Sequence, residues 1–352
     1  MKKSFEKWIS IIICIILFSI VAGNVFAYSA DVPKSCSIFT VSIGDTVFFG
    51  NNEDSQKTGT YMWVVPSQNV DTDSGTFSIY GIVAFGYNYN DDDSGDGYAQ
   101  GGMNDQGLCA DGNGLPLLSL NPHPERESPF TYPIDQILME CSSINEVIDW
   151  FQSHNLGTLW SNQLHFADVT GDAVVVSVGN DGELTFTRKG SSKYLVSTNF
   201  NLANSDVGQY PCQRYETATT MLETISFEQD LSVEVVRNVL EAIHEEGEYA
   251  TKYSNIFDPI NKDIYVYQNH NFEKVAKLNL NDEVAKVNLE TEGIVEDDML
   301  LLREIKIADL FSIETDEPIT QSSLISTEAV ILVVGVLSCF IVIASYWLFR
   351  KR

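Results

Sequence analysis

Cys36 is the residue of this chain whose surroundings point most directly to chemistry. It follows the apolar N-terminal leader closely, so removal of the leader and of the few residues after it would make Cys36 the first residue of the mature chain. Such a cysteine carries a thiol and a free α-amine on one residue. The amine can accept the thiol proton near neutral pH, because the usual pKa values of the two groups are about 8.5 and about 8. Cys36 is therefore a candidate nucleophile that supplies its own base.

Residues 1–27 form a predicted secretory signal peptide. Three lysines precede an almost wholly apolar stretch over residues 8–22, and Ala27 closes a small-residue cleavage site. The apolar stretch is shorter than the ~20 residues of a spanning helix, which favours cleavage over an uncleaved anchor. Residues 28–35 would then remain as a short pro-segment ahead of Cys36. A second cut is required, either by another protease or by Cys36 itself.

The C-terminal end has the pattern of a membrane anchor. Residues 329–349 contain no charged side chain and are followed at once by the basic tail 350–352. At ~1.5 Å per residue this stretch reaches about 30 Å, the thickness of a bilayer core. Tyr346 and Trp347 lie where interfacial aromatic residues belong, and the basic tail is expected in the cytoplasm. Residues 308–328, rich in Ser, Thr, Glu and Asp, resemble a stalk. These features predict a single-pass protein of the cell membrane whose main domain is extracellular.

The charge of the chain excludes nucleic acid as a partner. The sequence contains 21 basic and 49 acidic residues, for a net charge of -28, and of the acidic residues only Glu6 lies in the leader or the tail. An acidic surface of this kind repels phosphate backbones. The acidic patch at residues 90–97 lacks the spacing and the closing glutamate of a calcium-binding EF-hand, so we expect a solvated loop.

The cysteines show no metal-ligand spacing, so the sequence implies no metal and no other cofactor. Cys14 and Cys339 lie in the two apolar end segments. If Cys36 is the nucleophile, at most one disulfide can form among those that remain, which are Cys109, Cys141 and Cys212.

Residues 36–307 read as one domain, because no linker rich in Pro, Gly or Ser interrupts them. Strands are predicted where Val, Ile, Phe, Thr and Tyr gather, at residues 37–42, 46–50, 61–65, 77–85, 164–168, 173–178, 184–188 and 194–197. Apolar residues spaced three and four apart predict helices at 133–141, 144–154, 214–222 and 232–244, and a late hairpin is expected at 263–268 and 275–280. Blocks of strands followed by blocks of helices indicate an α+β fold with antiparallel sheets covered by helices.

Four segments occur in an order that resembles one known family. Cys36 leads a strand, a Gly44-Asp45 turn, a second strand and Gly50-Asn51-Asn52-Glu53-Asp54, and the later matches are residues 101–108, 197–201 and 210–215. This set resembles the N-terminal nucleophile hydrolases of the choloylglycine hydrolase and penicillin V acylase family, from Cys36 to about Leu280. The resemblance implies a four-layer αββα sandwich. It also implies hydrolysis of a linear amide C–N bond in a small-molecule substrate of the N-acyl amide, bile-salt or penicillin V type.

The resemblance also implies a role for each site residue. Asp54 matches the aspartate that holds the new α-amine, where a carboxylate would stabilise the ammonium form. Asn199 matches an oxyanion asparagine, a contact typically worth ~3 kcal/mol. Asn113, in the loop 111–114, is the nearest candidate for the second oxyanion donor. Arg214 matches a late active-site arginine, which we expect to favour the thiolate.

One position departs from the family, and two other interpretations compete with this one. Asn51 stands where many members carry an arginine, so neither bile-salt nor penicillin specificity is carried over. Asn51 also favours the alternative of a non-catalytic, membrane-tethered binding protein on a degenerate hydrolase scaffold. A papain-like hydrolase would pair Cys36 with a distant histidine, but the sequence around His165, His244 and His270 does not support that role. The oligomeric state stays open, and a homo-oligomer is compatible with the sequence.

Overall fold

The computed structural model describes residues 36–72, 75–88, 97–290 and 303–311. Within these ranges the chain forms two large antiparallel sheets, two short hairpins and the helices that cover them. The predicted signal peptide 1–27, pro-segment 28–35, anchor 329–349 and tail 350–352 lie outside the described residues. No helix inside the described ranges is long and apolar enough to cross a membrane.

The first sheet, sheet A, has six strands in the order β12-β1-β2-β15-β16-β17. Their bounds are β1 Ser37–Ile43, β2 Thr46–Asp54, β12 Tyr194–Ser197, β15 Thr251–Asp258, β16 Asp263–Gln268 and β17 Asn271–Asn279. The second sheet, sheet B, has eight strands in the order β11-β10-β9-β8-β7-β6-β3-β18. Their bounds are β3 Thr60–Val65, β6 Ile82–Asn88, β7 Gly97–Asn104, β8 Cys109–Ser119, β9 Leu159–Ala167, β10 Ala173–Val178, β11 Leu184–Arg188 and β18 Arg303–Lys306.

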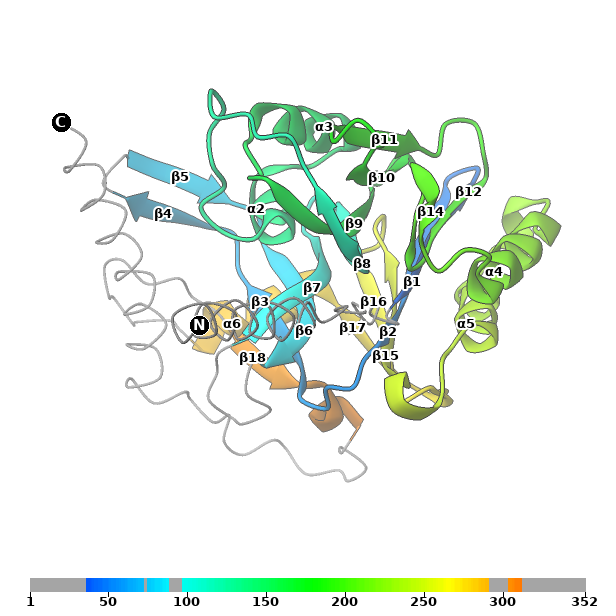
Figure 1. The fold of residues 1–352 in the computed structure, drawn as a ribbon. Helices are drawn as coiled ribbons and strands as arrows, with labels where there is room; N and C mark the ends of the chain where they lie inside the picture. Colours follow the sequence, from blue (N-terminus) through cyan, green and yellow to red (C-terminus); the bar gives the residue numbers. More distant parts are fainter. Residues whose placement is uncertain (1–35, 73–74, 89–96, 291–302, 312–352) are drawn as a thin grey trace, which may run out of the picture.

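Helices cover the outer face of each sheet (Figure 1). On sheet B, α2 (Pro133–Glu140) packs against β7 and β8, and α3 (Ile144–Ser153) against β9. On sheet A, α4 (Gln213–Thr224) packs against β1 and β12, and α5 (Val233–Ala242) against β2 and β15. One apolar core lies under each helical layer and a third lies between the sheets. The predicted αββα order of layers is the observed one.

The hairpin of β1 and β2 carries most of the residues of interest. Ile43 pairs with Thr46 across the two-residue turn Gly44-Asp45. Gly44 has φ +61, in the left-handed region that glycine adopts without a Cβ penalty. The short turn fixes the register of the whole hairpin, because every later pair is set by the first.

Several predicted elements differ from the observed ones. The strand expected at 77–85 is two strands, β5 (Gly75–Ile79) and β6, because the Tyr80 and Gly81 N–H groups donate to Met139 O and Asp105 Oδ2. β5 pairs with β4 (Gln68–Thr72) in a separate hairpin. The sequence analysis did not predict the long strands β7, β8 and β15 or the helix α6 (Leu280–Glu290).

One further expectation needs correction, and the open question of a disulfide is answered within the described ranges. The predicted stalk boundary at residue 308 falls inside the 3-10 helix η3 (Ile307–Phe311), whose Leu310 and Phe311 pack on the core between the sheets. The domain therefore extends at least to Phe311. The cysteines in the described ranges form no disulfide, since all are free and buried: Cys36, Cys109, Cys141 and Cys212.

The remaining elements are short. β13 (Phe200–Asn201) and β14 (Asn204–Gly208) form a two-stranded ribbon after β12. The 3-10 helices η1 (Glu228–Asp230) and η2 (Gly247–Tyr249) flank α5.

Candidate active site

Cys36 lies directly before β1 and is buried, with 1% of its surface exposed. Its Sγ donates to Glu53 Oε2 at 2.8 Å. Its carbonyl oxygen accepts from Asn113 Nδ2 and from Arg214 Nη1, each at 3.1 Å. Its φ is 70°, a left-handed conformation that a non-glycine residue rarely adopts. The residue is therefore fixed at its thiol and its carbonyl in a strained backbone conformation.

Glu53 is a site residue that the sequence analysis missed. The hairpin pairs Ser37 with Asn52, so the register continues to Glu53 opposite Cys36. The Gly44-Asp45 turn was recognised from the sequence, and counting outward from a two-residue turn reaches this pair. Glu53 Oε1 also accepts from Tyr87 Oη at 3.1 Å. The distance of Glu53 from the Gly44-Asp45 turn predicts its position opposite Cys36, whereas the family resemblance selects only its neighbour Asp54.

Asp54 lies on the opposite face of β2 from Glu53, because side chains alternate along a strand. Its Oδ2 accepts from Arg214 Nη1 at 3.1 Å and its Oδ1 from Thr251 Oγ1 at 2.5 Å. The backbone N–H of Cys36 also donates to the Asp54 carboxyl. The nitrogen that would become the α-amine is thus already bound to the aspartate predicted to hold it.

Arg214, in the first turn of α4, contacts five other residues of the site. Its Nη1 donates to Ser37 Oγ at 2.8 Å, besides Asp54 and the Cys36 carbonyl. Its Nη2 donates to Asn199 Oδ1 at 2.8 Å, and its Nε pairs with Glu245 at 3.0 Å. The guanidinium has five N–H donors in a planar fork. Nη1 has two of them for three acceptors, so one of its N–H groups is shared between two acceptors.

Of the two predicted oxyanion donors, Asn113 contacts the Cys36 carbonyl oxygen and Asn199 contacts Arg214. Asn113 is not in a loop as expected, because β8 continues through residues 111–114 and pairs with β9. Its position on that strand aims its amide at the Cys36 carbonyl. Asn199 follows β12, and its Nδ2 donates to Gly114 O at 3.0 Å. All five predicted site residues therefore meet at one place, while their catalytic roles stay predictions.

Burial and neighbouring carboxyl groups dominate the electrostatics of the Cys36 thiol. Burial, with Glu53, Asp111 and Asp54 nearby, raises the pKa of the Cys36 thiol well above its ordinary value. The guanidinium contacts the Cys36 carbonyl oxygen, whereas the thiol faces Glu53. The expectation that Arg214 favours the thiolate concerns an N-terminal Cys36 and stays a prediction.

Burial also raises the pKa of the acidic residues around the thiol. The pKa of Asp54 rises to about 7, although Arg214 and Thr251 oppose the shift. That of Asp111 also rises to about 7, and that of Glu53 rises well above its usual value, with Asp111 adding to the effect of burial. The thiol thus lies among carboxyl groups that gain protons readily.

Polar atoms without partners gather between the sheets near Cys36. The side-chain amides of Asn51 and Asn255 are fully buried, lie opposite each other on β2 and β15, and make no hydrogen bond within the described ranges. Asp111 Oδ2, Asn113 Oδ1 and Tyr253 Oη are also buried without a hydrogen-bond partner in the described ranges. Buried polar groups normally find partners, so this region is suited to water or to the polar groups of a ligand.

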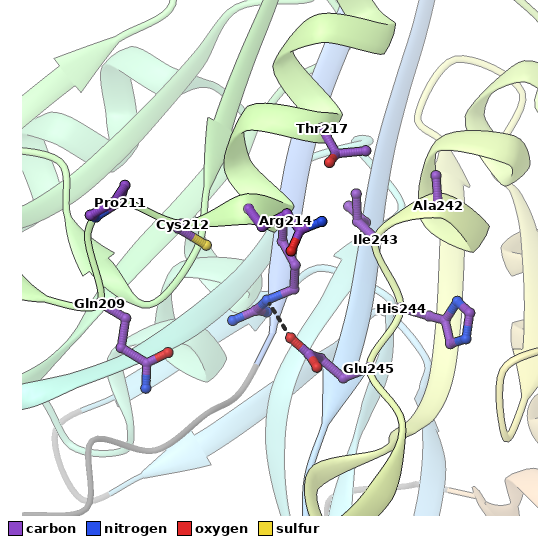
Figure 2. A pocket seen from close by; sticks show the side chains of 10 residues that line it. Gln209, Pro211, Cys212, Arg214, Thr217, Ala242, Ile243, His244 and Glu245 are labelled. Atoms are coloured by element: carbon purple, nitrogen blue, oxygen red, sulfur yellow. Dashed lines mark ion pairs between the residues drawn. The ribbon is translucent and has the colours of Figure 1, made fainter.

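A pocket of about 360 Å³ adjoins the site on the side of the helices (Figure 2). It lies between the start of α4 and the segment after α5, and Figure 2 shows the Arg214–Glu245 ion pair inside it. Its walls include Gln209, Pro211, Cys212, Thr217 and His244. Arg214 lines the pocket and also donates to the Cys36 carbonyl oxygen, so this side chain connects the pocket to the cysteine.

No histidine takes the position that a papain-like mechanism needs within the described ranges. The buried His165 uses its two ring nitrogens on Ser197 Oγ at 2.9 Å and Thr40 Oγ1 at 3.0 Å. Burial lowers its pKa to about 3, so it stays neutral. His244, in the pocket wall, stacks on His270. The histidines behave as structural residues, as the sequence analysis expected.

Solved structures share the fold of this chain. A mutant of conjugated bile acid hydrolase from Clostridium perfringens matches with a TM-score of 0.54 and 13% identity, over 77% of this chain and 96% of that chain. The chain has the fold of this hydrolase. A second variant of the hydrolase gives a TM-score of 0.55 at 12% identity, over 82% of this chain and 100% of that chain. These two similarities confirm the predicted resemblance to the choloylglycine hydrolase family as far as the fold is concerned.

Penicillin V acylase from Agrobacterium tumefaciens is also similar, with a TM-score of 0.49 and 16% identity, over 66% of this chain and 82% of that chain. A scan against protein-family models and a search of curated proteins give no match.

Proposed function

We propose that the chain is an amide hydrolase whose nucleophile is the thiol of an N-terminal Cys36. The observation that carries the proposal is the bond from the Cys36 nitrogen to the buried Asp54 carboxyl, beside the ion pair with Arg214. Once the Ser35–Cys36 bond is cut, this nitrogen becomes an amine. Asp54 can then hold it in place as it takes the thiol proton.

The reaction follows from the positions of the other groups. The Cys36 sulfur attacks the carbonyl carbon of a linear amide, and the carbonyl oxygen gains a negative charge. Asn199 Nδ2 lies 3.0 Å from Gly114 O and would exchange that acceptor for the new oxyanion, with Asn113 as the second donor. The C–N bond then breaks, and the leaving amine takes the proton from the Cys36 ammonium. Water hydrolyses the resulting thioester and restores the thiol.

The substrate proposed is a small N-acyl amide, of the general kind that a bile-salt conjugate or penicillin V represents. The pocket beside Arg214 has a volume of about 360 Å³, which lies in the range of small-molecule sites. Asn51 replaces an arginine of the family pattern, so the acyl group and the amine are to be determined by experiment.

We also propose that the domain acts outside the cell and is held at the membrane. The support is the leader at residues 1–27 and the uncharged stretch 329–349 followed by basic residues. Protease treatment of intact cells should release the domain, and disrupted cells should be needed to reach a tag placed after Arg352.

The proposal is tested by the N-terminus and the turnover of the mature protein together. N-terminal sequencing should find Cys36 first. The same sample should hydrolyse at least one member of a panel of acylated amino acids, aryl-acetyl amides and penicillin V, and Cys36→Ala should hydrolyse none. A mature chain that begins at Tyr28 and keeps Cys36 internal would contradict the proposal and favour the non-catalytic alternative.

A further inference from the structure

The pocket beside Arg214 lies on the leaving-group side of the proposed reaction. The nitrogen of Cys36 donates to the Asp54 carboxyl, and in the proposed turnover this nitrogen gives its proton to the leaving amine. Asp54 pairs with Arg214 at 3.1 Å, and Arg214 pairs with Glu245 in the pocket at 3.0 Å (Figure 2). An amine that leaves on this side of the cysteine extends toward the pocket.

Arg214 is already occupied and has no free charge to offer an anionic substrate. Its Nη1 donates to Asp54 and to the Cys36 carbonyl, and its Nη2 donates to Asn199. Its Nε pairs with Glu245. With both carboxyl groups ionised, one guanidinium stands against two carboxylates, which leaves a net charge of -1 on the three residues.

Two further carboxyl groups lie near the thiol without a cation beside them. Glu53 accepts from Cys36 Sγ at 2.8 Å, and Asp111 is close enough to add to the rise in the pKa of both the thiol and Glu53. In the part of the chain that the structure describes, neither carboxyl forms an ion pair, and Asp111 Oδ2 has no hydrogen-bond partner. The surroundings of the nucleophile are therefore acidic, and a cationic group is the charge that offsets them.

The walls of the pocket present more carboxylate than guanidinium to a ligand. The Glu245 side chain keeps 38% of its surface exposed, whereas that of Arg214 keeps 9%. The next residue of the same wall segment, Glu246, is 78% exposed and lies 3.5 Å from His244. Besides His244, the other polar lining side chains are uncharged groups that can accept a hydrogen bond: Gln209, Gln213 and Thr217.

We propose that the substrate of this site is an N-acyl amide whose amine part carries a second, positively charged group, as in an N-acylated diamine, and that Glu245 binds this group. The ammonium lies against the exposed carboxylate of Glu245 and donates its remaining hydrogens to the uncharged polar groups of the pocket. An amine part with a free carboxylate would face Glu245 and find no unpaired cation among the lining residues that the structure describes. The pocket thus selects by attracting one charge and repelling the other.

The inference deepens the proposed function and rests on it, since it names the substrate class of the same site. It leaves the chemistry at Cys36 unchanged and assigns Glu245 to binding. It also ranks the substrate panel, because acylated amino acids and penicillin V carry a free carboxylate. Uncharged aryl-acetyl amides should be hydrolysed faster than either of them.

The test compares three amides that share one acyl group and differ in the charge at the end of the amine part. They are the phenylacetyl amides of diaminobutane, aminobutanol and aminobutyrate, with both functional groups on terminal carbons, and they are cationic, neutral and anionic. With the full mature chain in detergent micelles, kcat/KM should be about 10-fold higher for the cationic amide than for the neutral one, and lower again for the anionic one. These differences should shrink in about 1 M salt, which screens partly exposed charges.

Two variants separate charge recognition from folding. Glu245→Gln keeps an acceptor for Arg214 Nε and removes the charge, so the ratio of kcat/KM for the cationic amide to that for the anionic amide should fall about 10-fold. A purely structural role of Glu245 would slow all three amides alike and leave this ratio unchanged. Glu228→Gln is the matched control, because it removes the same charge at the turn of the β1–β2 hairpin, the end away from Cys36, and its ratio should equal that of the wild type.

Calorimetry on Cys36→Ala, which binds the three amides without turnover, makes the outcomes of the two proposals distinguishable. The cationic amide should bind most tightly, and Glu245→Gln in the same background should abolish this preference. Equal affinities, or tightest binding and fastest turnover of the anionic amide, would overturn the inference and leave the amide hydrolase in place. A chain that begins at Cys36, prefers the cationic amide through Glu245 and hydrolyses no amide of either set would uphold the inference for the pocket and contradict the proposed function.

Discussion

Arg214 Nη1 lies 3.1 Å from Asp54 Oδ2, with side-chain exposures of 9% and 0%. Arg214 lies in the first turn of α4 and Asp54 ends β2, so the pair joins the outer helical layer to the strand that carries the site. A buried ion pair is costly to break from one side, because the remaining charge has no compensation. The same guanidinium holds the Cys36 carbonyl, so the stability of the domain and the position of the nucleophile depend on one side chain.

Arg214→Gln should lower the free energy of unfolding by about 3–5 kcal/mol, the usual loss when one partner of a buried pair is removed. Urea denaturation measures it. The control is Arg188→Gln, since Arg188 forms a more exposed pair with Asp172 and such pairs contribute about 0–1 kcal/mol. The double variant Arg214→Gln with Asp54→Asn should recover part of the loss. If Arg214→Gln and Arg188→Gln lower the free energy of unfolding equally, the buried pair stabilises the domain no more than the exposed one.

Asn199→Ala should lower kcat about 100- to 1000-fold and leave KM within a few-fold, because an oxyanion donor acts only in the transition state. The change is measured with whichever amide of the panel turns over fastest. Asn204→Ala, on β14 in the following ribbon, is the control and should retain turnover. A rise in KM at constant kcat would instead assign Asn199 to substrate binding.

The fold was largely predictable because its strands and helices follow simple periodicities. The strands β1, β2, β9 and β10 are rich in β-branched and aromatic residues, and α3 and α5 carry apolar residues on one face. β7 escaped prediction because its glycines give no strand signal. Gly101 and Gly102 are needed there, since a Cβ would lie 2.5 Å from the Asp111 carboxyl and 2.4 Å from Val83 O. That requirement is visible only once the neighbouring strands are in place.

The sequence could predict which residues form the site, but not which atoms their side chains contact. Resemblance selected Cys36 and Asp54, and counting from the Gly44-Asp45 turn would have added Glu53. The direction of each side chain could not be read from the sequence. Whether Arg214 faces the thiol or the carbonyl of Cys36 depends on how α4 packs on sheet A, which is a property of the three-dimensional structure.

Asp111→Asn should make stability less dependent on pH. Burial raises the pKa of Asp111 from 3.8 to about 7, so between these values the folded chain binds a proton that the unfolded chain has lost. The contribution of Asp111 to the free energy of unfolding is therefore full below about pH 4 and falls as the pH rises toward 7, by up to about 1.4 kcal/mol per pH unit.

The variant should thus be more stable than the wild type at pH 8, and the two should converge below pH 4. Urea denaturation at several pH values measures the difference. A difference that stays constant from pH 4 to pH 8 would mean that Asp111 does not titrate in this window.

The neighbours Asn51 and Asn52 should respond in opposite ways to the same substitution. Asn51 is buried without a hydrogen bond in the described ranges, whereas Asn52 donates to Leu240 O at 2.8 Å and accepts from Ser254 Oγ at 2.7 Å. Leucine has nearly the shape of asparagine. Asn51→Leu should therefore raise the free energy of unfolding by about 1 kcal/mol, since it removes an unpaired amide.

Asn52→Leu should lower it by about 2–3 kcal/mol, because it leaves Leu240 O and Ser254 Oγ without a partner. If Asn51 serves the substrate, Asn51→Leu should also lower kcat/KM while the domain becomes more stable, the usual exchange of stability against function at a site. A loss of stability in both variants would show instead that Asn51 is satisfied by bound water, which the leucine displaces.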